Sequence, residues 1–425
     1  MTATIEVVVR LTISEEDFDV NRLEERVRAA RNEAGRELFT RALQALEEEA
    51  VSAHPGVVRP RRVERHLDTT LGPIVFARWR VKWEGRTTCL LDRLLGLVRH
   101  SRVSPAVKKR ASELARRMTY REASAVLGEE MGTPVSAQSG HSWVQPLGAA
   151  IAERELIPVS APAAPSAPLP RREVVVAEWD DTLVRSQEKG KAHFSMKLGI
   201  GYSQKQRQGP QRWKLTDKVV YGGVEEPENF AARFSARMEE SLQVEEAAHV
   251  VVKGDGAEWI CQGAEQVFPG HVFQLDRWSR PAGLDRIAQF AGSQPRLWKR
   301  LRTWVFQGRV SALIRSLRQL VGADARSQAA RQELRGYVTR HAQAITAVHR
   351  LRPLVSPQAP PLLTHGTGAM EKNSEVLIAR RFKRWGMRWT RRGAHHLLKL
   401  RRWIARCGKS WFEALYARQP QLTNA

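Results

Sequence analysis

The sequence predicts a multidomain α/β protein, and three observations lead to that class. The chain has 425 residues, 42% of them hydrophobic, which is enough for two or three domains with cores of their own. A proline- and alanine-rich stretch, Ser160 to Pro170, can form neither a regular helix nor a central strand, so we place an interdomain linker at residues 156–172. After the linker, β-branched runs alternate with amphipathic segments, as in a sheet whose strands are joined by helices.

Residues 1–60 are expected to form a strand and one charged helix. The run IEVVVRLTI at residues 5–13 has the β-branched composition of a strand. Residues from about Ser14 to Ala50 are rich in Leu, Glu, Arg and Ala, which is typical of a long helix.

Residues 61–150 are expected to form a β-hairpin followed by short helices. Two extended runs flank the turn Leu71-Gly72-Pro73, which predicts the hairpin. The caps and breaks that define the helices are Ser104, Pro105, Thr119, Glu122, Gly132 and Ser136. Two helices joined by a short glycine turn are typical of helix-turn-helix DNA-binding modules, although many small helical bundles share this pattern.

Residues 173–418 are expected to form a second core. Three strand-like runs come first, and a helix, a strand, a helix and a strand follow them. The strand-like runs are EVVVAEWDDTLVRS, HFSMKLGIGYS, WKLTDKVVYGG, HVVVKGDG and HVFQLD. This is the element order of a ribonuclease H-like core, in which a hairpin sheet is continued by parallel strands. The arginine-rich region at about 280–362 is expected to be all-helical, and the family resemblance given below implies that it is an insertion in this core. A helix containing AMEKNSEVLIARRFKRW follows it.

The net charge of +24 is concentrated in two stretches. Residues 280–352 hold fifteen Lys or Arg against three Asp or Glu, and residues 371–418 hold fourteen against three. Six tryptophans lie among these cations: Trp298, Trp304, Trp385, Trp389, Trp403 and Trp411. When a basic surface binds nucleic acid, the counterions held by the phosphates are released into the solvent, which favours binding. The pattern therefore favours nucleic acid as the partner. A solvated helix face is the plainer alternative, and a membrane surface fits less well because no broad apolar face accompanies the charge.

Other features narrow the class of protein. No apolar run approaches the roughly 18 residues of a membrane span, and the start lacks the basic leader and apolar run of a secretory signal. Cys89, Cys261 and Cys407 form no CxxC pair, which argues against a zinc knuckle or a disulfide framework. We therefore expect a cytoplasmic, nucleoid-associated protein that has no membrane partner.

Two aspartates are candidates for metal chemistry. Asp180 lies in the first strand of the second core, and Asp255 follows the fourth strand between two glycines. The first and fourth strands are neighbours in a ribonuclease H-like sheet, so the two carboxylates would meet at one edge. Hard oxygen ligands suit Mg²⁺ or Mn²⁺, and two ions about 3.5–4 Å apart would activate the attacking oxygen and stabilise the leaving one. Glu371 is the candidate for a third carboxylate, with Glu375 as the fallback.

Plainer interpretations of these aspartates remain open. A lone aspartate in a Gly-Asp-Gly turn is more often a turn residue or a helix cap than a metal ligand. Strand alternation sends Asp180 and Asp181 to opposite faces, and the pattern alone does not choose between them.

Taken together, these segments resemble the Lre-type insertion-sequence transposases of bacteria, whose core is similar to that of Mutator-like DDE enzymes. EWDDTLVRSQ followed by KLGIGY resembles the family's first-aspartate strand, and its register selects Asp180 because Gln187 stands seven residues later. VVKGDGAEWI followed by FQLDRW resembles the second-aspartate segment and selects Asp255. The segment that begins GTGAMEKNSEVLIARR resembles the closing segment, in which Glu371, Arg381 and residues 386–389 match. The hairpin and MTYREASAVLG resemble the family's N-terminal module, so the resemblance covers most of residues 61–402.

Two departures from the family pattern concern activity. The family often has a histidine soon after the aspartate of the fifth strand, where this chain has Ser279. Small residues after the glutamate are replaced by Lys372 and Asn373, which makes that edge more basic.

The resemblance implies a DNA transposase that cleaves at insertion-sequence ends and transfers the strand into target DNA. Asp180, Asp255 and Glu371 would be the catalytic residues and would hold Mg²⁺ or Mn²⁺, two ions in all. DNA, as terminal inverted repeats and as target, is the expected partner, and a homo-oligomer is left open. The cations expected on DNA are Arg121, Arg381, Lys383, Arg384, Arg388, Arg391 and Arg392. The rival expectation is a catalytically inactive, repurposed DNA-binding protein, and a structure-selective nuclease is a third.

Overall fold

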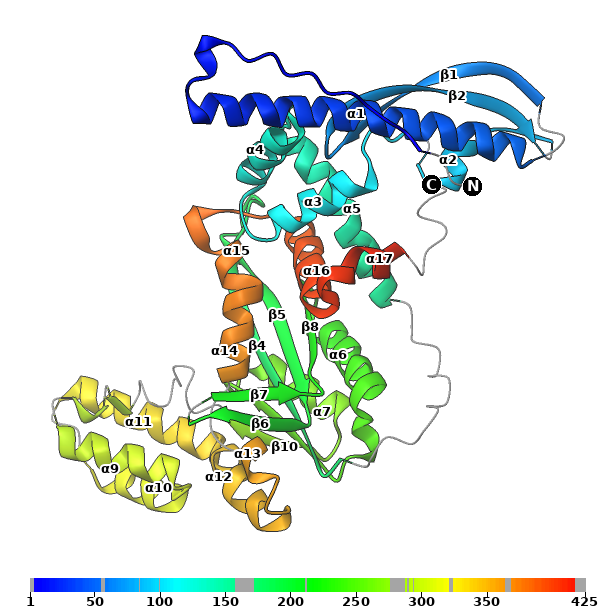
Figure 1. The fold of residues 1–425 in the computed structure, drawn as a ribbon. Helices are drawn as coiled ribbons and strands as arrows, with labels where there is room; N and C mark the ends of the chain where they lie inside the picture. Colours follow the sequence, from blue (N-terminus) through cyan, green and yellow to red (C-terminus); the bar gives the residue numbers. More distant parts are fainter. Residues whose placement is uncertain are drawn as a thin grey trace. The chain divides into compact units, whose positions relative to one another are not determined.

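The computed structural model describes residues 4–54, 58–83, 85–98, 100–156, 172–210, 212–275, 287–288, 290–292, 294–320, 324–363 and 368–416 (Figure 1). The chain divides into two compact units, one formed by residues 1–151 with 403–425 and the other by residues 152–402. Each unit mixes helices with β-structure, so the expected α/β class is confirmed at this coarse level.

The first unit is built on a long helix and a β-hairpin. Helix α1 (Val20–Ser52) begins at Asp19, whose side chain accepts a hydrogen bond from the Asn21 backbone N–H. Strands β1 (Val58–Thr69) and β2 (Gly72–Trp83) form the expected hairpin, and β3 (Arg86–Cys89) adds a third antiparallel strand. Their core contains Leu43, Leu67 and Phe76.

The prediction of a strand at residues 5–13 is wrong. In the described chain these residues pair with no strand, and the first helical turn is a 3₁₀ helix at Glu15–Asp17. Val8 and Ile13 are 79% and 67% exposed, so the β-branched run has no sheet to bury it. Composition favours a strand, but only a partner strand can satisfy its backbone groups.

The three capped helices expected in the first unit begin where the sequence predicts, and the third continues beyond its expected end to Leu156. The bounds of these and of the unit's other short helices are α2 (Leu90–Leu94), α3 (Pro105–Ala115), α4 (Tyr120–Met131), α5 (Ala137–Leu156) and α17 (Trp411–Tyr416). Ser104 caps α3, and the Thr119–Glu122 capping box starts α4. Gly132 ends α4 in the left-handed conformation, with φ +66°.

The second unit contains a five-stranded sheet in the order β10-β9-β4-β5-β8. Its strands are β4 (Val174–Arg185), β5 (His193–Tyr202), β8 (Val219–Gly223), β9 (His249–Gly254) and β10 (Val272–Leu275). Strands β4, β5 and β8 form an antiparallel series, whereas β9 runs parallel to both β4 and β10. A crossover through α6 (Pro227–Leu242) leads to β9, and a second through α7 (Glu258–Val267) leads to β10.

The third expected strand is divided in two. Its first half, β7 (Arg212–Thr216), pairs with β6 (Gln204–Gly209) in a separate hairpin, and only its second half is β8. Asp217 breaks the run at φ +52°. The Asp217 carboxylate accepts hydrogen bonds from Arg172 Nη2 at 3.2 Å and Ser203 Oγ at 3.0 Å, which hold this turn.

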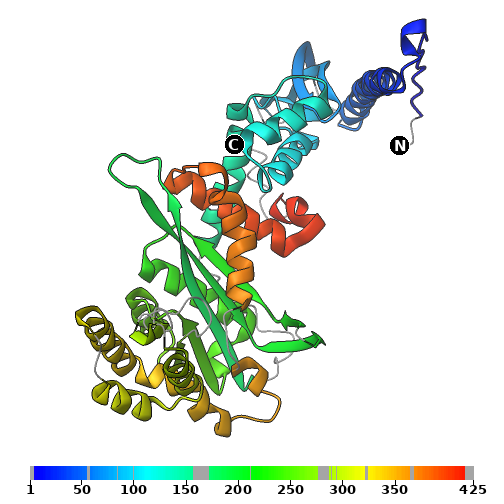
Figure 2. The same ribbon diagram turned by 90° about the vertical axis from the view of Figure 1, so that its left-hand side faces the viewer.

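The two faces of the sheet differ in what covers them. One face buries an aromatic cluster against α6 and α7, with Trp179, Phe230 and Phe234 at 1% exposure or less. On the other face, α14 (Gly368–Ser374) lies along β4 and β5 (Figure 2). The strand β4 therefore places its odd-numbered residues in the aromatic core and its even-numbered residues toward α14.

The region expected to be an all-helical insertion is helical wherever it is described. Its helices are α9 (Pro295–Phe306), α10 (Val310–Gln319), α11 (Ala325–Arg340), α12 (Ala342–Leu351) and α13 (Pro360–Leu363). They bury a core of their own that includes Leu301, Leu313 and Leu334.

The last predicted helix is not regular. After α14 the chain forms a π-helical turn at Glu375–Ala379, a short helix α15 (Arg380–Phe382) and a 3₁₀ turn before α16 (Arg391–Cys407). Among the described helices, none is long and apolar enough to cross a membrane.

Candidate active site

Asp180 and Asp255 lie at corresponding positions of neighbouring parallel strands. The strand register pairs Glu178 of β4 with Lys253 of β9, and each aspartate lies two residues further along. Neighbouring strands are about 4.8 Å apart, so the two aspartate backbones come within one strand spacing of each other where this register continues. Asp180 is half-buried and Asp255 is exposed. Each aspartate thus lies the same two residues beyond the last pair of the two strands, and the meeting of their carboxylates stays a prediction.

Both aspartates also accept a local backbone hydrogen bond. Asp255 Oδ1 accepts a hydrogen bond from the Ala257 backbone N–H at 2.9 Å, and Asp180 Oδ1 accepts one from the Asp181 N–H at 2.8 Å. The Asp255 bond spans two residues, as in the turns that aspartate commonly forms. The turn interpretation of Asp255 is therefore correct, and it leaves the second carboxylate oxygen to point elsewhere.

Helix α14 carries Glu371 along the same face of β4. The Met370 N–H donates to Glu178 Oε2 at 3.1 Å, and the hydroxyls of Ser374 and Thr182 lie 3.0 Å apart. Since Glu178, Asp180 and Thr182 share one face of the strand, α14 passes over Asp180 between these two contacts. Glu371 is exposed in the first turn of this helix, and Glu375 is exposed where the π turn begins.

The three carboxylates are not drawn together into a metal-binding cluster. Over the described ranges, no group of three or more His, Cys, Asp or Glu side chains is arranged to hold a metal ion. Asp180 and Asp255 each lie two residues beyond the last pair of β4 and β9, whereas Glu371 lies on α14, the helix that covers this face of β4. Their oxygen chemistry fits Mg²⁺ or Mn²⁺.

A buried pair below the aspartates anchors α14, and sequence reasoning missed it. Glu178 and Lys253 are paired across β4 and β9 and are 0% and 1% exposed. Glu178 accepts hydrogen bonds from Tyr202 Oη at 2.6 Å and from the Met370 N–H, while Lys253 Nζ donates to the Leu362 carbonyl at 2.8 Å. Burial, together with the negative charge of Glu178, raises the pKa of Tyr202 well above its usual value. A charged residue inside an apolar run was the available signal, because such residues are buried only with partners.

Asp181 faces the opposite side of the sheet from Asp180. Its carboxylate accepts a hydrogen bond from Ser195 Oγ, and it is paired with Lys197 across β5. Burial lowers the pKa of Lys197, and the nearby charge of Asp181 partly offsets this. Asp181 therefore belongs to the face that α6 and α7 cover.

The segments that carry the family resemblance meet at the far end of β4. Gln187 donates through its backbone N–H to the Trp389 carbonyl at 2.9 Å and through Nε2 to the Arg388 carbonyl at 2.8 Å. Arg381 is 1% exposed and lies 4.7 Å from the centre of the Trp389 ring. Because this guanidinium packs inside the protein, Arg381 supports the fold. The expectation that Arg381 contacts DNA is therefore wrong.

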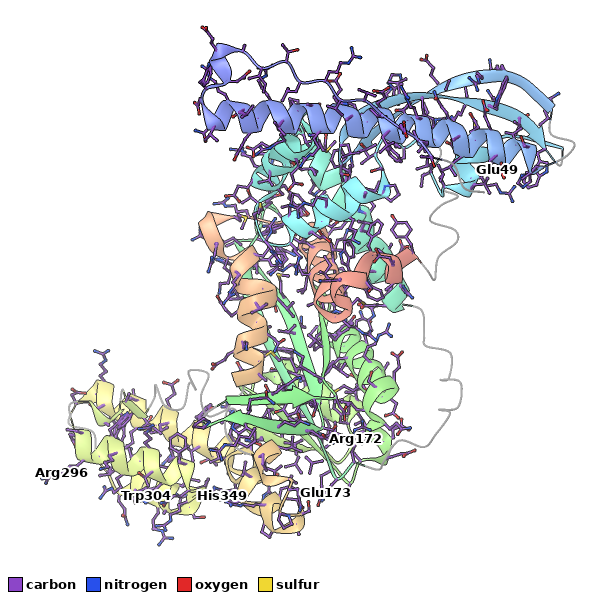
Figure 3. All side chains as sticks on the ribbon, viewed as in Figure 1. Glu49, Arg172, Glu173, Arg296, Trp304 and His349 are labelled. Carbon is purple, nitrogen blue, oxygen red and sulfur yellow. The ribbon has the colours of Figure 1, made fainter. Side chains whose placement is uncertain are left out.

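The other cations expected on DNA lie at the surface. Arg121, Lys383, Arg384, Arg388 and Arg392 are exposed. Arg391 is half-buried and forms an ion pair with Glu226 at 3.2 Å. In the helical insertion, α9 presents arginines stacked on aromatic rings; Arg296 and Trp304 on this helix are labelled in Figure 3. Arg300 lies 5.4 Å from the Trp304 ring centre, and Arg302 lies 5.0 Å from that of Trp298.

A second group of buried charged side chains is formed by residues of α16 and their acidic partners. Lys399 is 1% exposed, and its Nζ lies 2.9 Å from Glu155 Oε2 and 3.0 Å from Glu225 Oε1. Burial, with a contribution from the charge of Lys399, lowers the pKa of His395 to about 4. Arg402 forms an ion pair with Glu155. Ser279, the departure from the family's histidine, lies outside the described residues.

Fold and site together define a mixed α/β protein in which one aspartate lies within a sheet strand and a second directly follows the neighbouring parallel strand. The chain belongs to the uncharacterised protein family UPF0236, whose family model matches residues 13–418. The UPF0236 protein of the vanSb 3′ region of Streptococcus gallolyticus is 30% identical over 206 residues, which are 48% of this chain and 44% of that protein. A UPF0236 protein of Caldanaerobacter subterraneus is 25% identical over 269 residues, 61% of this chain and 54% of its own length. A second UPF0236 protein of Caldanaerobacter subterraneus has the same identity and coverage, and the name of this protein lists several designations together. The matches span about half the length of these relatives.

Proposed function

We propose that this protein is a metal-dependent DNA-cleaving and strand-joining enzyme, a transposase with a ribonuclease H-like core. The observation that carries the proposal is the sheet order β10-β9-β4-β5-β8, in which Asp180 lies within β4, two residues beyond its last pair with β9, and Asp255 directly follows β9. Three antiparallel strands continued by two parallel ones is the arrangement expected of such a core. The joined designations of the Caldanaerobacter relative are also consistent with a sequence that recurs within one genome.

In this proposal Asp180, Asp255 and Glu371 hold Mg²⁺ or Mn²⁺, with Glu375 as the alternative third ligand. The metal would supply Lewis-acid stabilisation of the phosphate oxygens at which bonds form and break. The chain's own residues supply the frame: the strand register fixes two carboxylates, and the Glu178–Met370 hydrogen bond fixes the helix that carries the third. The exposed cations hold the DNA backbone, which positions the strand without reading its sequence.

The test is cleavage of labelled DNA that carries the sequences flanking the gene, with Mg²⁺ or Mn²⁺ and with chelator as the control. Asp255→Asn and Asp180→Asn should abolish metal-dependent nicking while DNA binding is retained. Asp181→Asn is the matched control, because this neighbour carries the same charge on the opposite face and should keep activity. Comparing Glu371→Gln with Glu375→Gln identifies the third ligand.

A DNA-binding protein without catalysis is the second candidate. Two observations favour it: the concentrated positive charge, and the lack of a three-carboxylate cluster in the described part of the chain. Tight DNA binding by wild type and by Asp255→Asn, with no nicking under either metal, would decide for it.

A further inference from the structure

A cleft of about 560 Å³ lies beside the Gly-Asp-Gly turn, between α7, β10 and α12. We propose that this cleft binds one nucleotide of a DNA strand next to the candidate active site. The proposal rests on the proposed function, since it assigns to the same site a place for the strand to be held. Its volume falls within the 300–1,000 Å³ of typical ligand sites.

The cleft is adjacent to Asp255. The ring of His341 packs so closely on Gly256 that a Cβ there would lie 3.0 Å from His341 Cε1. Gly256 has φ +87°, a conformation that glycine adopts readily, and this lets the turn and the ring approach each other. On the other side, burial raises the pKa of the Cys261 thiol, and the charge of Asp255 adds to the effect. A group held in the cleft therefore lies next to the residue proposed to bind metal.

The lining has the two parts that a nucleotide needs. Arg340, His341 and Arg350 contribute cationic or hydrogen-bonding groups. Arg340 and Arg350 are exposed, and Arg350 Nη2 donates a hydrogen bond to the carbonyl of Gln343, another lining residue, at 3.0 Å. Phe273 and Leu351 contribute an apolar wall on which a base or a sugar can lie. Guanidinium groups suit phosphate, and aromatic surfaces suit bases.

One carboxylate argues against a purely anionic ligand. Glu265 also lines the cleft, and its side chain is 79% exposed, 3.9 Å from His271 Nδ1. A free anion would meet this charge without gaining from the apolar wall. A nucleotide can direct its phosphate toward the arginines and its uncharged parts toward the rest.

Cysteine alkylation tests the proposal on the intact protein. Cys261 lines the cleft, whereas Cys89 and Cys407 do not and serve as internal controls. A short single-stranded oligonucleotide with free ends, at about ten times its Kd, should slow iodoacetamide labelling of Cys261 by about tenfold. Labelling of the two control cysteines should change by less than about twofold on the same occupancy argument.

A matched pair of variants separates the cleft from general charge. Arg340→Glu should remove the protection of Cys261, whereas Arg326→Glu should keep it. Both residues are exposed on α11, and 14 helical residues place them about 21 Å apart, so the charge change is the same but only one lies in the cleft. A gel shift on both variants measures overall DNA binding.

Three results would overturn the proposal, and they differ in what they say of the function. DNA binding without protection of Cys261 would reject the cleft and leave the proposed function standing. Equal protection by polyglutamate would show a general polyanion site. A complete lack of DNA binding would reject the cleft and the proposed function together.

Discussion

Removing the Glu178 carboxylate should destabilise the second unit and release the start of α14. In Glu178→Leu, the Tyr202 hydroxyl and the Met370 N–H both lose their buried acceptor. Each buried donor left without a partner costs about 1–3 kcal/mol, so we expect a loss of about 2–6 kcal/mol in the free energy of unfolding. Lys253, at the paired position, loses a compensating negative charge, which places the loss toward the upper end.

Two milder variants give the expected gradient. Glu178→Gln keeps one carbonyl oxygen and exchanges charge-assisted hydrogen bonds for neutral ones, which should cost about 1–2 kcal/mol. Tyr202→Phe removes a single donor and should cost about 1 kcal/mol. The order of the three losses follows from the number of donors left without an acceptor.

The assay is urea unfolding followed by fluorescence, combined with amide hydrogen exchange. Trp179 is 1% exposed in the aromatic cluster of this unit and reports its unfolding. Exchange of the Met370 amide should quicken in Glu178→Leu and stay unchanged in Tyr202→Phe. If Glu178→Leu unfolds within about 1 kcal/mol of wild type and the Met370 amide stays protected, the anchoring role is refuted.

Three further predictions concern the buried groups of the same unit. Lys399→Met leaves Glu225 and its neighbours with less positive charge in a buried site and should cost about 3–5 kcal/mol, measured by denaturant unfolding. The pKa of His395 is lowered to about 4 from 6.5, so the folded protein keeps this side chain neutral where the unfolded chain would protonate it. The contribution of the neutral His395 to the free energy of unfolding is therefore complete above about pH 6.5 and is lost as the pH falls toward 4. That loss amounts to about 3 kcal/mol and should be absent in His395→Asn, compared by unfolding at several pH values. Gly199→Ala places a Cβ 3.0 Å from the Phe234 ring, and overpacking should cost about 1–3 kcal/mol by thermal unfolding.

Each of these has a clear contrary result. An unfolding free energy unchanged by Lys399→Met would mean that the buried carboxylates adjust without their cation. Identical acid sensitivity of wild type and His395→Asn would assign the pH dependence to other groups. A fully stable Gly199→Ala would show that the Phe234 ring moves aside without cost.

The positions of β4, β9 and the turn at Asp255 could be predicted from the sequence because they depend on local patterns. β-branched runs mark β4 and β9, and glycines mark the turn at Asp255. The helix starts at Ser104 and Thr119 could also be predicted, since a helix cap is a short-range hydrogen bond.

The features that could not be predicted from the sequence depend on contacts between residues that are distant in the chain. The run at residues 5–13 has strand composition but no strand beside it. Arg381 reads as a surface cation, yet Trp389 folds back over it. The π turn after α14 has no sequence signature here. Glu178 and Lys253 stand in apolar runs, so their burial was legible, but the backbone groups that they bind lie more than a hundred residues away.

The alternation along β4 has a consequence for how this sequence can vary over evolutionary time. Val175, Ala177 and Trp179 pack in the aromatic core, so their replacement should lower the amount of folded protein. Asp180 and Thr182 face α14 from the other side, where a change would leave folding largely intact and alter only what the sheet edge can do. Selection for folding would thus act on Val175, Ala177 and Trp179 and also on the buried Glu178, whereas Asp180 and Thr182 would be under selection only for what the sheet edge does. A copy under no such selection could change at Asp180 and Thr182 while it still folds.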